Sequence, residues 1–343
     1  MSQIQSEQKP VTILTGFLGA GKTTFLNDFL QQNKDKRYAI IENEFGEQGI
    51  DGELVLQPDD NIVELNNGCL CCTLNDNLFD ILNDLFDRRN EYDEIIIEAT
   101  GVADPTGLAQ PFVSHPLIKR HFPLKGVICL VDAELIENQL IDTEEAKNQV
   151  AFSDVLLINK TDLVTQDHVK DLEGKLGRMN PLATIVQGNK QAYPAIQLDA
   201  QQSPLDGLFQ HDHHGHASEL EEQFPVKKPH SHHHHKHTDE IVSQTFHFDQ
   251  PFDYRMLDHK LLVYLMLQAK DLYRMKGRVW LDGSDDPYIV QSVGERLEIE
   301  PGNAWPAGQE KKSVLVFIGK NLQRPGIEKL LQQSLSKRNS VHP

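Results

Sequence analysis

Cysteine, basic residues and long apolar runs are all scarce in this chain of 343 residues. Four cysteines do not make a secreted disulfide framework, and three of them crowd into Cys69-Leu70-Cys71-Cys72, where neighbours could hardly pair without strain. No apolar run approaches the ~20 residues that span a bilayer, and the polar segment 1–10 has no basic stretch leading into an apolar one. We therefore expect a cytoplasmic protein with reduced thiols and no membrane partner.

The excess of negative charge bears on which macromolecules this protein can bind. Lysine and arginine number 33 against 51 acidic residues, which gives a formal net charge of -18. This sign repels phosphate backbones, so we expect no nucleic-acid partner. The length exceeds that of a typical single domain and predicts two domains joined by a linker, each large enough to bury its own core.

The first half of the chain alternates short apolar runs with longer amphipathic stretches. This pattern predicts an α/β domain with a mainly parallel sheet, and near-continuous apolar runs are typical of strands buried on both faces. Each run ends in polar residues or glycine. The expected strands are 11–16, 38–44, 94–101, 126–133 and 154–160.

The composition changes abruptly after about residue 205. Ten of the sixteen histidines lie between His211 and His237, among acids, lysines and prolines with little to bury, which indicates a flexible linker. Beyond it, apolar segments predict a small α+β domain with a mixed or antiparallel sheet. Strands are expected at 242–248, 274–282, 288–297 and 311–319, with helices at about 254–269 and from about 325. The predicted division is a tail (1–10), a nucleotide domain (11–205), the histidine-rich linker (206–240) and a C-terminal domain (241–337).

A glycine-rich segment directly follows the first expected strand and precedes an amphipathic helix, as the P-loop pattern requires. Its glycines let backbone N–H groups surround phosphate oxygens, its lysine reaches the β- and γ-phosphates, and its first threonine ligates Mg²⁺. A chance glycine-rich turn would not have all these parts. The predicted nucleotide-binding residues here are Gly16, Phe17, Leu18, Gly19, Ala20, Gly21, Lys22, Thr23 and Thr24, with Lys22 and Thr23 also catalytic.

Two further segments complete a guanine-nucleotide site. Glu98 ends the expected strand EIIIE, where a carboxylate can lie near Mg²⁺ and act in catalysis, and Gly101 can bring its backbone to the γ-phosphate. Asn159, Lys160, Thr161 and Asp162 form an NKxD motif, in which the aspartate accepts two hydrogen bonds from guanine. Adenine lacks that donor pair and would leave the carboxylate unpaired. The alternatives are that Glu98 is a solvent-exposed acid at the end of a strand, and that the NKxD residues form an ordinary turn.

Cys69, Cys71 and Cys72 are candidate metal ligands. Thiolates suit zinc, and also cobalt, nickel or copper(I), but adjacent cysteines cannot all surround one ion comfortably, so another ligand is needed. Candidates are Glu42, Glu47 and His115, the last of which could equally be a surface histidine. Small apolar core packing is the alternative for the cysteines. Cys129, in the middle of a strand, is predicted to be core.

The histidine-rich linker offers mostly neutral imidazoles without fixed geometry, which should hold divalent metal loosely. Because it is internal and interrupted, it does not look like an expression tag. A solvated loop is the other reading. Its predicted ligands are His211, His213, His214, His216, His230, His232, His233, His234, His235 and His237.

Several of these motifs together resemble the CobW-type family of P-loop GTPases, which includes metallochaperones proposed to supply zinc or cobalt to client proteins. They are GFLGAGKTT, IENEFGE, NNGCLCC, EATGVADP, NKTD and the C-terminal RMKGRVWLDG. The resemblance covers the chain from Val11 to about Leu331 apart from the histidine-rich linker. It implies a separate CobW C-terminal domain, slow GTP hydrolysis, and metal bound by the three clustered cysteines at a site coupled to the nucleotide. It also associates Glu42, Glu47 and His115 with metal, and places 72–76 near the nucleotide.

The functional hypothesis is therefore a GTP- and Mg²⁺-dependent chaperone that binds Zn²⁺ and delivers it to a client metalloprotein. A Co²⁺ chaperone of the same type and a passive histidine-rich metal buffer are the alternatives. A small-molecule P-loop kinase is disfavoured because it would use neither the NKxD motif nor the cysteines. No arginine finger or water-positioning glutamine stands out, so we expect slow turnover that a client or homodimerisation would raise.

Overall fold

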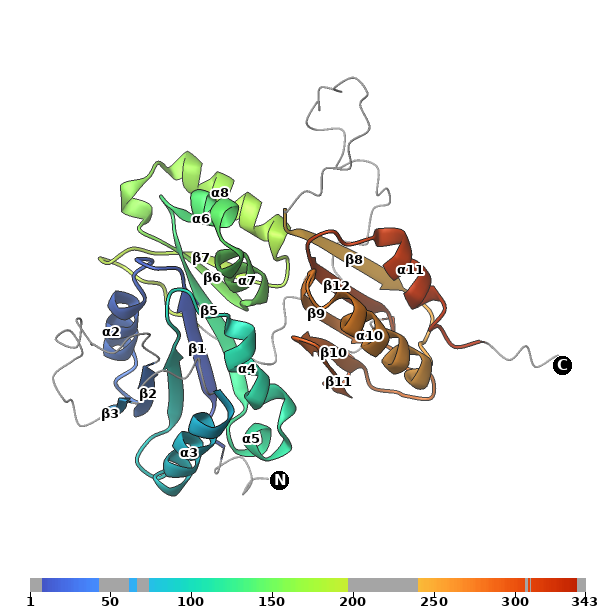
Figure 1. Cartoon of the computed structure of the whole chain (residues 1–343), viewed down its shortest axis with the longest axis horizontal. Helices are drawn as coiled ribbons and strands as arrows, with labels where there is room; N and C mark the ends of the chain where they lie inside the picture. The colour runs from blue at the N-terminus through green and yellow to red at the C-terminus, as the bar shows by residue number, and fades with distance from the viewer. Residues whose placement is uncertain are drawn as a thin grey trace.

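The computed structural model describes residues 8–42, 62–66, 74–196, 240–305, 308 and 310–337. They form two sheets that lie side by side (Figure 1). Among the helices of these residues, none combines the length and the apolar character that a membrane crossing needs.

The first sheet is parallel throughout and has the order β3-β2-β4-β1-β5-β6-β7. Its strands are β1 (Val11–Gly16), β2 (Tyr38–Glu42), β3 (Ile62–Asn66), β4 (Glu94–Glu98), β5 (Leu124–Asp132), β6 (Val155–Asn159) and β7 (Thr184–Gln187). The chain reverses its direction of winding at β1, and ligands of open α/β sheets bind at the carboxyl edge beside such a point.

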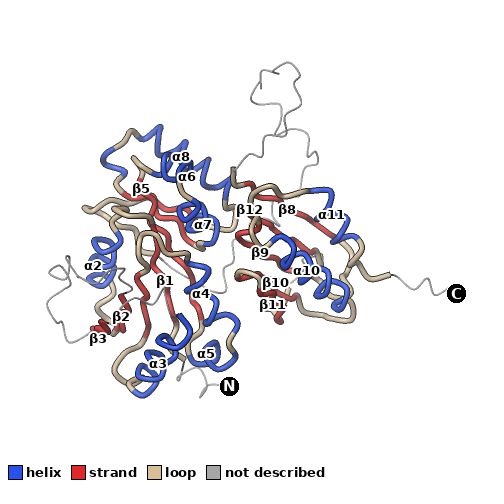
Figure 2. The backbone as a smooth tube through the Cα atoms, in the orientation of Figure 1, coloured by secondary structure: helices blue, strands red, loops and turns tan. Residues whose placement is uncertain are grey.

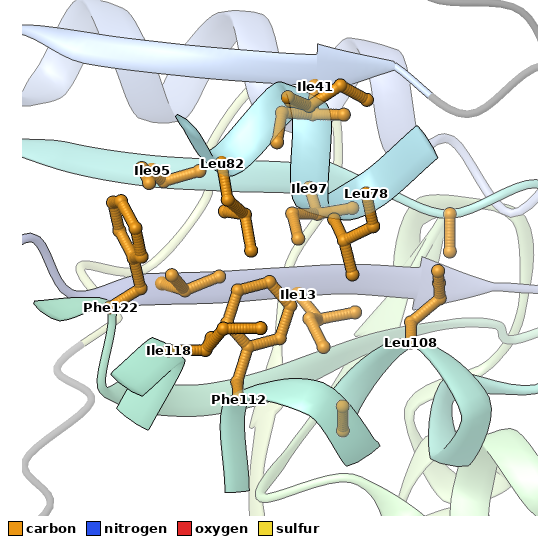
Figure 3. Packing of buried hydrophobic residues seen from close by; sticks show 14 of the residues in the cluster. Ile13, Ile41, Leu78, Leu82, Ile95, Ile97, Leu108, Phe112, Ile118 and Phe122 are labelled. Carbon is orange, nitrogen blue, oxygen red and sulfur yellow. The ribbon is translucent and has the colours of Figure 1, made fainter. Parts of the chain in front are cut away.

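Helices cover both faces of this sheet, as Figure 2 shows. They are α2 (Lys22–Gln32), α3 (Leu74–Asp87), α4 (Pro105–Ser114), α5 (Pro116–His121), α6 (Ile136–Asp142), α7 (Glu144–Phe152) and α8 (Gln166–Met179). On one face Ile13 packs with Leu82 of α3 and Phe112 of α4 (Figure 3). On the other face Leu14 packs with Phe25 of α2. Burial on both faces explains the near-continuous apolar strands.

The second sheet is antiparallel, in the order β11-β10-β9-β12-β8. It consists of β8 (Val242–Phe248), β9 (Leu272–Val279), β10 (Tyr288–Val293), β11 (Arg296–Pro301) and β12 (Ser313–Gly319), with helices α10 (Tyr254–Gln268) and α11 (Arg324–Gln332). Leu315 and Phe317 of β12 pack under α10 and α11. Val314, Val316 and Ile318 point the other way and share a core with α7 and α8. The first domain thus covers the second face of this sheet.

The predicted fold class is confirmed, namely a parallel α/β domain followed by an antiparallel α+β domain. Some elements were missed or wrong. The short strands β3 and β7 were not predicted, because four or five residues give little periodic signal. The single strand expected at 288–297 is a hairpin, in which β10 pairs with β11 after a turn at Gly294 that has φ +59°.

Charged and polar side chains add to the apolar contact between the two domains. Arg274 of β9 donates to the carbonyl oxygen of Phe152 and to Asp154 Oδ1, the latter at 2.5 Å. Glu144, at the start of α7, accepts from Tyr273 Oη at 2.7 Å and from Lys320 Nζ at 3.1 Å. Burial opposes the charge of Glu144, but hydrogen bonds from Lys147, Tyr273 and Lys320 lower its pKa to about 2.

Replacing Glu144 by Gln tests the acid sensitivity of this contact. The folded pKa of about 2 lies below the ordinary 4.5, so the carboxylate stabilises the fold fully above pH 4.5, and this contribution disappears as the pH falls towards 2. Because the side chain is 47% exposed, we expect a loss of only about 1 kcal/mol at pH 7. The measurement is the thermal midpoint of unfolding of wild type and variant between pH 7 and pH 2, where the two should converge at the acid end.

Glu145→Gln is the matched control, because the exposed Glu145 carboxylate, next to Glu144 in the sequence, forms no ion pair with another described residue. Curves for wild type and Glu144→Gln that stay parallel down to pH 2 would contradict the assignment.

Candidate functional site

The loop between β1 and α2 has the backbone shape that phosphate binding needs. Gly16 ends β1 with φ +142°, and Gly21 precedes α2 with φ +93°. A Cβ atom on Gly16 would lie 2.5 Å from the carbonyl oxygen of Leu130, and one on Gly21 would lie 2.6 Å from Asn159 Nδ2. Side chains are therefore excluded at both positions by conformation and by space. The loop ends at a helix N-terminus, where free N–H groups and the helix dipole favour anions.

Lys22 and Thr23 open α2 and point to two different partners. Lys22 Nζ donates to the carbonyl oxygen of Gly16 at 2.9 Å, so its side chain folds back along the loop. Burial lowers the pKa of Lys22, while the nearby Glu98 and Cys129 act in the opposite direction. Thr23 Oγ1 donates to Glu98 Oε1 at 3.1 Å. A hydroxyl and a carboxylate are thus together beside the loop, and these oxygen donors suit Mg²⁺.

The NKxD segment is bonded to the phosphate loop. Asn159 is buried, and its Nδ2 donates to the carbonyl oxygen of Ala20 at 2.8 Å. Lys160 has φ +60°, and its Nζ forms an ion pair of 2.7 Å with Asp132 Oδ2. Thr161 Oγ1 donates to Gly188 O at 3.1 Å, and Asp162 is exposed. The motif is therefore held by side-chain contacts while its aspartate faces solvent.

The segment after β4 also lies against the loop. A Cβ atom on Gly101 would come within 2.7 Å of the backbone nitrogen of Leu18, so only glycine fits here. Gln149 of α7 holds this segment from behind, since its Nε2 donates to the carbonyl oxygens of Gly101 and Ala103 at 3.1 and 3.2 Å. The other predicted loop residues differ in burial. Leu18 is 61% exposed, Ala20 is buried, Phe17 packs into the core shared with the second domain, and Thr24 is exposed.

Most of the predicted metal ligands lie outside the described residues. These are Cys69, Cys71, Cys72, Glu47 and the ten histidines of the histidine-rich linker. Glu42 is the last residue of β2, and its Cα is in register with Glu98 on one side and Asn66 on the other. Within the described ranges no group of three or more His, Cys, Asp or Glu could hold a metal ion.

His115 caps a helix, and Cys129 belongs to the core. His115 Nδ1 accepts from the backbone N–H of Ile118 at 3.4 Å, and its ring meets Phe79 of α3 edge-on at 5.1 Å. With Nδ1 used as an acceptor, a neutral ring carries its proton on Nε2, so His115 would bind a metal ion through Nε2 only if that proton moved to Nδ1 and the helix cap were lost. Cys129 is buried as predicted, and burial raises the pKa of its thiol to about 12. A thiol with so high a pKa is a poor metal ligand.

Two residues of this site were not predicted from the sequence. Asp132 is 1% exposed, ends β5 and pairs with Lys160. It could have been predicted, because it ends an apolar run in the same way that a polar residue ends each neighbouring run. Gln149, also 1% exposed, lies within a polar stretch of α7 whose sequence resembles a solvent-facing helix. Nothing in one sequence distinguishes it from an exposed glutamine.

The fold and these contacts define a nucleotide-binding domain of the P-loop GTPase class. Residues 10–187 match the model of the CobW/HypB/UreG nucleotide-binding domain, and residues 241–335 match the cobalamin synthesis protein cobW C-terminal domain. The chain belongs to this CobW family. It contains the family's nucleotide-binding and C-terminal modules in that order.

Relatives and solved structures are similar over nearly the whole chain. The zinc chaperone YjiA of Escherichia coli is 34% identical over 90% of this chain and 93% of its own. The zinc-regulated GTPase metalloprotein activator 1 of Schizosaccharomyces pombe is 31% identical over 92% and 83%. The crystal structure of Zn(II)-bound YjiA GTPase from E. coli has a TM-score of 0.66 at 29% identity and covers 96% of this chain and 99% of that one.

Replacing Asp132 by Asn tests the support of the NKxD segment. The change keeps the shape and the acceptor that caps Glu134, but it removes the charge that orients Lys160. Because this contact holds the segment that is predicted to bind the base and not the phosphates, the affinities for GTP and GDP should fall equally, by about tenfold or about 1.4 kcal/mol. Titration with fluorescent guanine nucleotides measures both.

The control for this variant is Glu137→Gln, which removes an exposed ion pair with Lys175 on the same domain and should leave both affinities unchanged. A loss confined to GTP, or no loss at all, would show that Asp132 has no part in holding the base site.

Proposed function

We propose that this protein is a GTP-hydrolysing metallochaperone, in which the nucleotide state controls a thiolate metal site. The observation that best supports this proposal is that the ends of neighbouring strands line up at one edge of the sheet. Glu98 bonds Thr23 of the phosphate loop, Glu42 is in register with Glu98, and Asn66 is in register with Glu42. Adjacent strands are about 4.8 Å apart, and Cys69 follows Asn66 by three residues. The strand that precedes the cysteine segment in the sequence is therefore joined to the strand of Glu98 through two strand pairings.

We assign a residue to each contact with the nucleotide. Lys22 would exchange its bond to the Gly16 carbonyl for a phosphate oxygen, and Gly101 would offer its backbone N–H to the γ-phosphate. Asp162 would accept the two guanine donors, with Asn159 at the other edge of the base. A Mg²⁺ ion held by Thr23 and Glu98 would neutralise charge on the phosphates. GTP and GDP with Mg²⁺ are thus the nucleotide and cofactor of the proposal.

The metal cargo is proposed to be zinc, bound by Cys69, Cys71 and Cys72. Similarity to proteins named zinc chaperones supports zinc over cobalt, which remains the alternative because thiolates accept both ions. Glu42, Glu47 and His115 are the proposed additional ligands, and His115 would give up its hydrogen bond with the Ile118 N–H to bind the metal ion through Nε2. His115 packs on Phe79 of α3, and α3 starts only two residues after Cys72 in the sequence, which supports its inclusion.

The histidine-rich linker is proposed to collect metal ions for the cysteine site. Imidazoles bind zinc more weakly and exchange it faster than a thiolate cluster, so ions would pass from the former to the latter. Delivery to a client metalloprotein in the cytoplasm completes the proposal, with hydrolysis that is slow until a client or a second copy of the chain accelerates it. A passive buffer would use the linker without the nucleotide site.

Replacing Glu98 by Gln tests the cofactor role. We expect the Mg²⁺ concentration that half-saturates GTP hydrolysis to rise about tenfold, because a neutral amide is a weaker Mg²⁺ ligand. The measurement is phosphate release at a series of Mg²⁺ concentrations. Glu94→Gln, at the opposite end of the same strand, is the control and should keep the wild-type Mg²⁺ dependence. An unchanged Mg²⁺ requirement in Glu98→Gln would remove Glu98 from the site.

The coupling between nucleotide and metal is tested by zinc affinity in two nucleotide states. Competition with a chelator should give affinities at least about tenfold apart for the GTP-analogue and GDP forms, a coupling of about 1.4 kcal/mol. Substituting Ser for Cys69, Cys71 and Cys72 should abolish this difference. Deleting 211–237 should remove weakly bound zinc and leave the difference intact.

Equal zinc affinities in the two states, together with GTP hydrolysis that zinc does not alter, would rule out the coupled chaperone. Loss of all zinc binding on deletion of 211–237 would favour the passive buffer instead.

A further inference from the structure

Helix α7 lies between the phosphate-loop side of the first domain and the second domain (Figure 1). Its residue Gln149 is 1% exposed, and both of its side-chain hydrogen bonds go to one short segment, the carbonyl oxygens of Gly101 and Ala103. Gly101 in turn touches the backbone of Leu18 in the phosphate loop. A single buried amide therefore ties α7 to the segment that faces the γ-phosphate position.

The two ends of the same helix hold the second domain. Glu144 at its N-terminus accepts from Tyr273 and Lys320, and the carbonyl oxygen of Phe152 at its C-terminus accepts from Arg274. Asn180 also clamps the C-terminal end, because its Nδ2 donates to the carbonyl oxygens of Val150 and Ser153 at 2.8 and 2.9 Å. With its last carbonyls bonded in this way, α7 should move as a rigid body.

Helix α4 provides a second connection between the segment 101–104 and the second domain. Asp104 caps this helix by accepting from the backbone N–H of Thr106 at 2.9 Å. A Cβ atom on Gly294, in the β10–β11 turn, would be 3.7 Å from Thr106 Cγ2. The segment 101–104 thus continues directly into a helix whose first turn rests on the second domain.

These contacts cannot all persist if the segment 101–104 shifts. A displacement of Gly101 and Ala103 would leave both N–H groups of a buried amide without acceptors, which is costly. The alternative is that α7 follows the segment, and then Glu144 and Phe152 displace Tyr273, Lys320 and Arg274. A packed interface responds to such a movement by switching between discrete arrangements.

We infer that Gln149 is a positioning residue for the GTPase reaction, which fixes the carbonyls of Gly101 and Ala103 and transmits their position through α7 to β9 and β12 of the second domain. By linkage, a client that binds and biases the second domain changes the relative affinity for GTP and GDP by the same factor. The inference rests on the proposed function in one respect, namely that Gly101 lies at the γ-phosphate.

The test uses the full-length protein and Gln149→Met, which keeps the length of the side chain and removes its donors. The preference for a GTP analogue over GDP should fall about tenfold, and single-turnover hydrolysis should slow. In wild type, hydrogen exchange at the amides of β9 and β12 should differ between the two nucleotide states, and in Gln149→Met this difference should vanish. The matched control is Ser153→Ala at the C-terminal end of α7, which removes the hydrogen bond to the backbone carbonyl of Gln149 and leaves the Gln149 side-chain amide bonded to 101–104.

A second variant covers the case in which Gln149→Met fails to fold. Tyr273→Phe combined with Lys320→Met disconnects α7 at its far, exposed end and should weaken the hydrogen-exchange difference at β9. Unchanged hydrolysis, nucleotide preference and hydrogen exchange in Gln149→Met, or an unaltered exchange difference in the double variant, would overturn the inference.

Gly101→Ala separates this inference from the proposed function. If Gly101→Ala leaves hydrolysis unchanged, the assignment of the γ-phosphate position is wrong. If Gly101→Ala impairs hydrolysis while Gln149→Met behaves as wild type, the nucleotide site stands and the transmission through α7 is refuted.

Discussion

Parallel pairing of the first sheet is the constraint on which the rest of the structure depends. Because all its strands run in one direction, their carboxyl ends meet at one edge. Six of them end on residues of the candidate site or of segments that lead into it: Gly16, Glu42, Asn66, Glu98, Asp132 and Asn159. The apolar parts of β1, β4, β5 and β6 are buried, and the first polar residue or glycine after each lies at the shared edge. Burial thus determines where the polar groups gather.

Side-chain bonds then join the gathered groups into two neighbouring units. Thr23 and Glu98 form one beside the phosphate loop, and Asp132 with Lys160 forms the other beside the NKxD segment. Asn159 bridges them through the carbonyl oxygen of Ala20. Because these bonds are made within the chain, the loop and the NKxD segment are preorganised, and less order has to be created when a nucleotide binds.

The second domain is joined to the first by a continuous core as well as by ion pairs. Alternate residues of β12 face opposite directions, with Leu315 and Phe317 under α10 and α11, and Val314 and Val316 against the first domain. Separating the domains would expose the second set to water. The domain contact is therefore an apolar interface with charged groups around it, which is the kind of contact through which a small shift in one domain is felt in the other.

Much of this could be predicted from residues alone. Strands β1, β5 and β6 follow from apolar runs, the loop from its glycines and Lys22, and the second domain from its alternating segments. Strand β3 could not be predicted, because five residues with an internal Glu64 carry no clear period. Gln149 could not be recognised, because its importance comes from burial against Gly101, a residue 48 positions away.

The sequence by itself determined which chemistry is present: glycines where no side chain fits, a lysine and a threonine at a helix start, thiols in one cluster, and an NKxD motif after a buried strand. Local patterns decide these features, since each depends on neighbours a few residues away. Only the tertiary structure decided that Glu42 is in register with Glu98, that Asp132 holds Lys160, and that α7 connects the site to the second domain. Such relations come from strand order and burial, which depend on contacts between residues far apart in the chain.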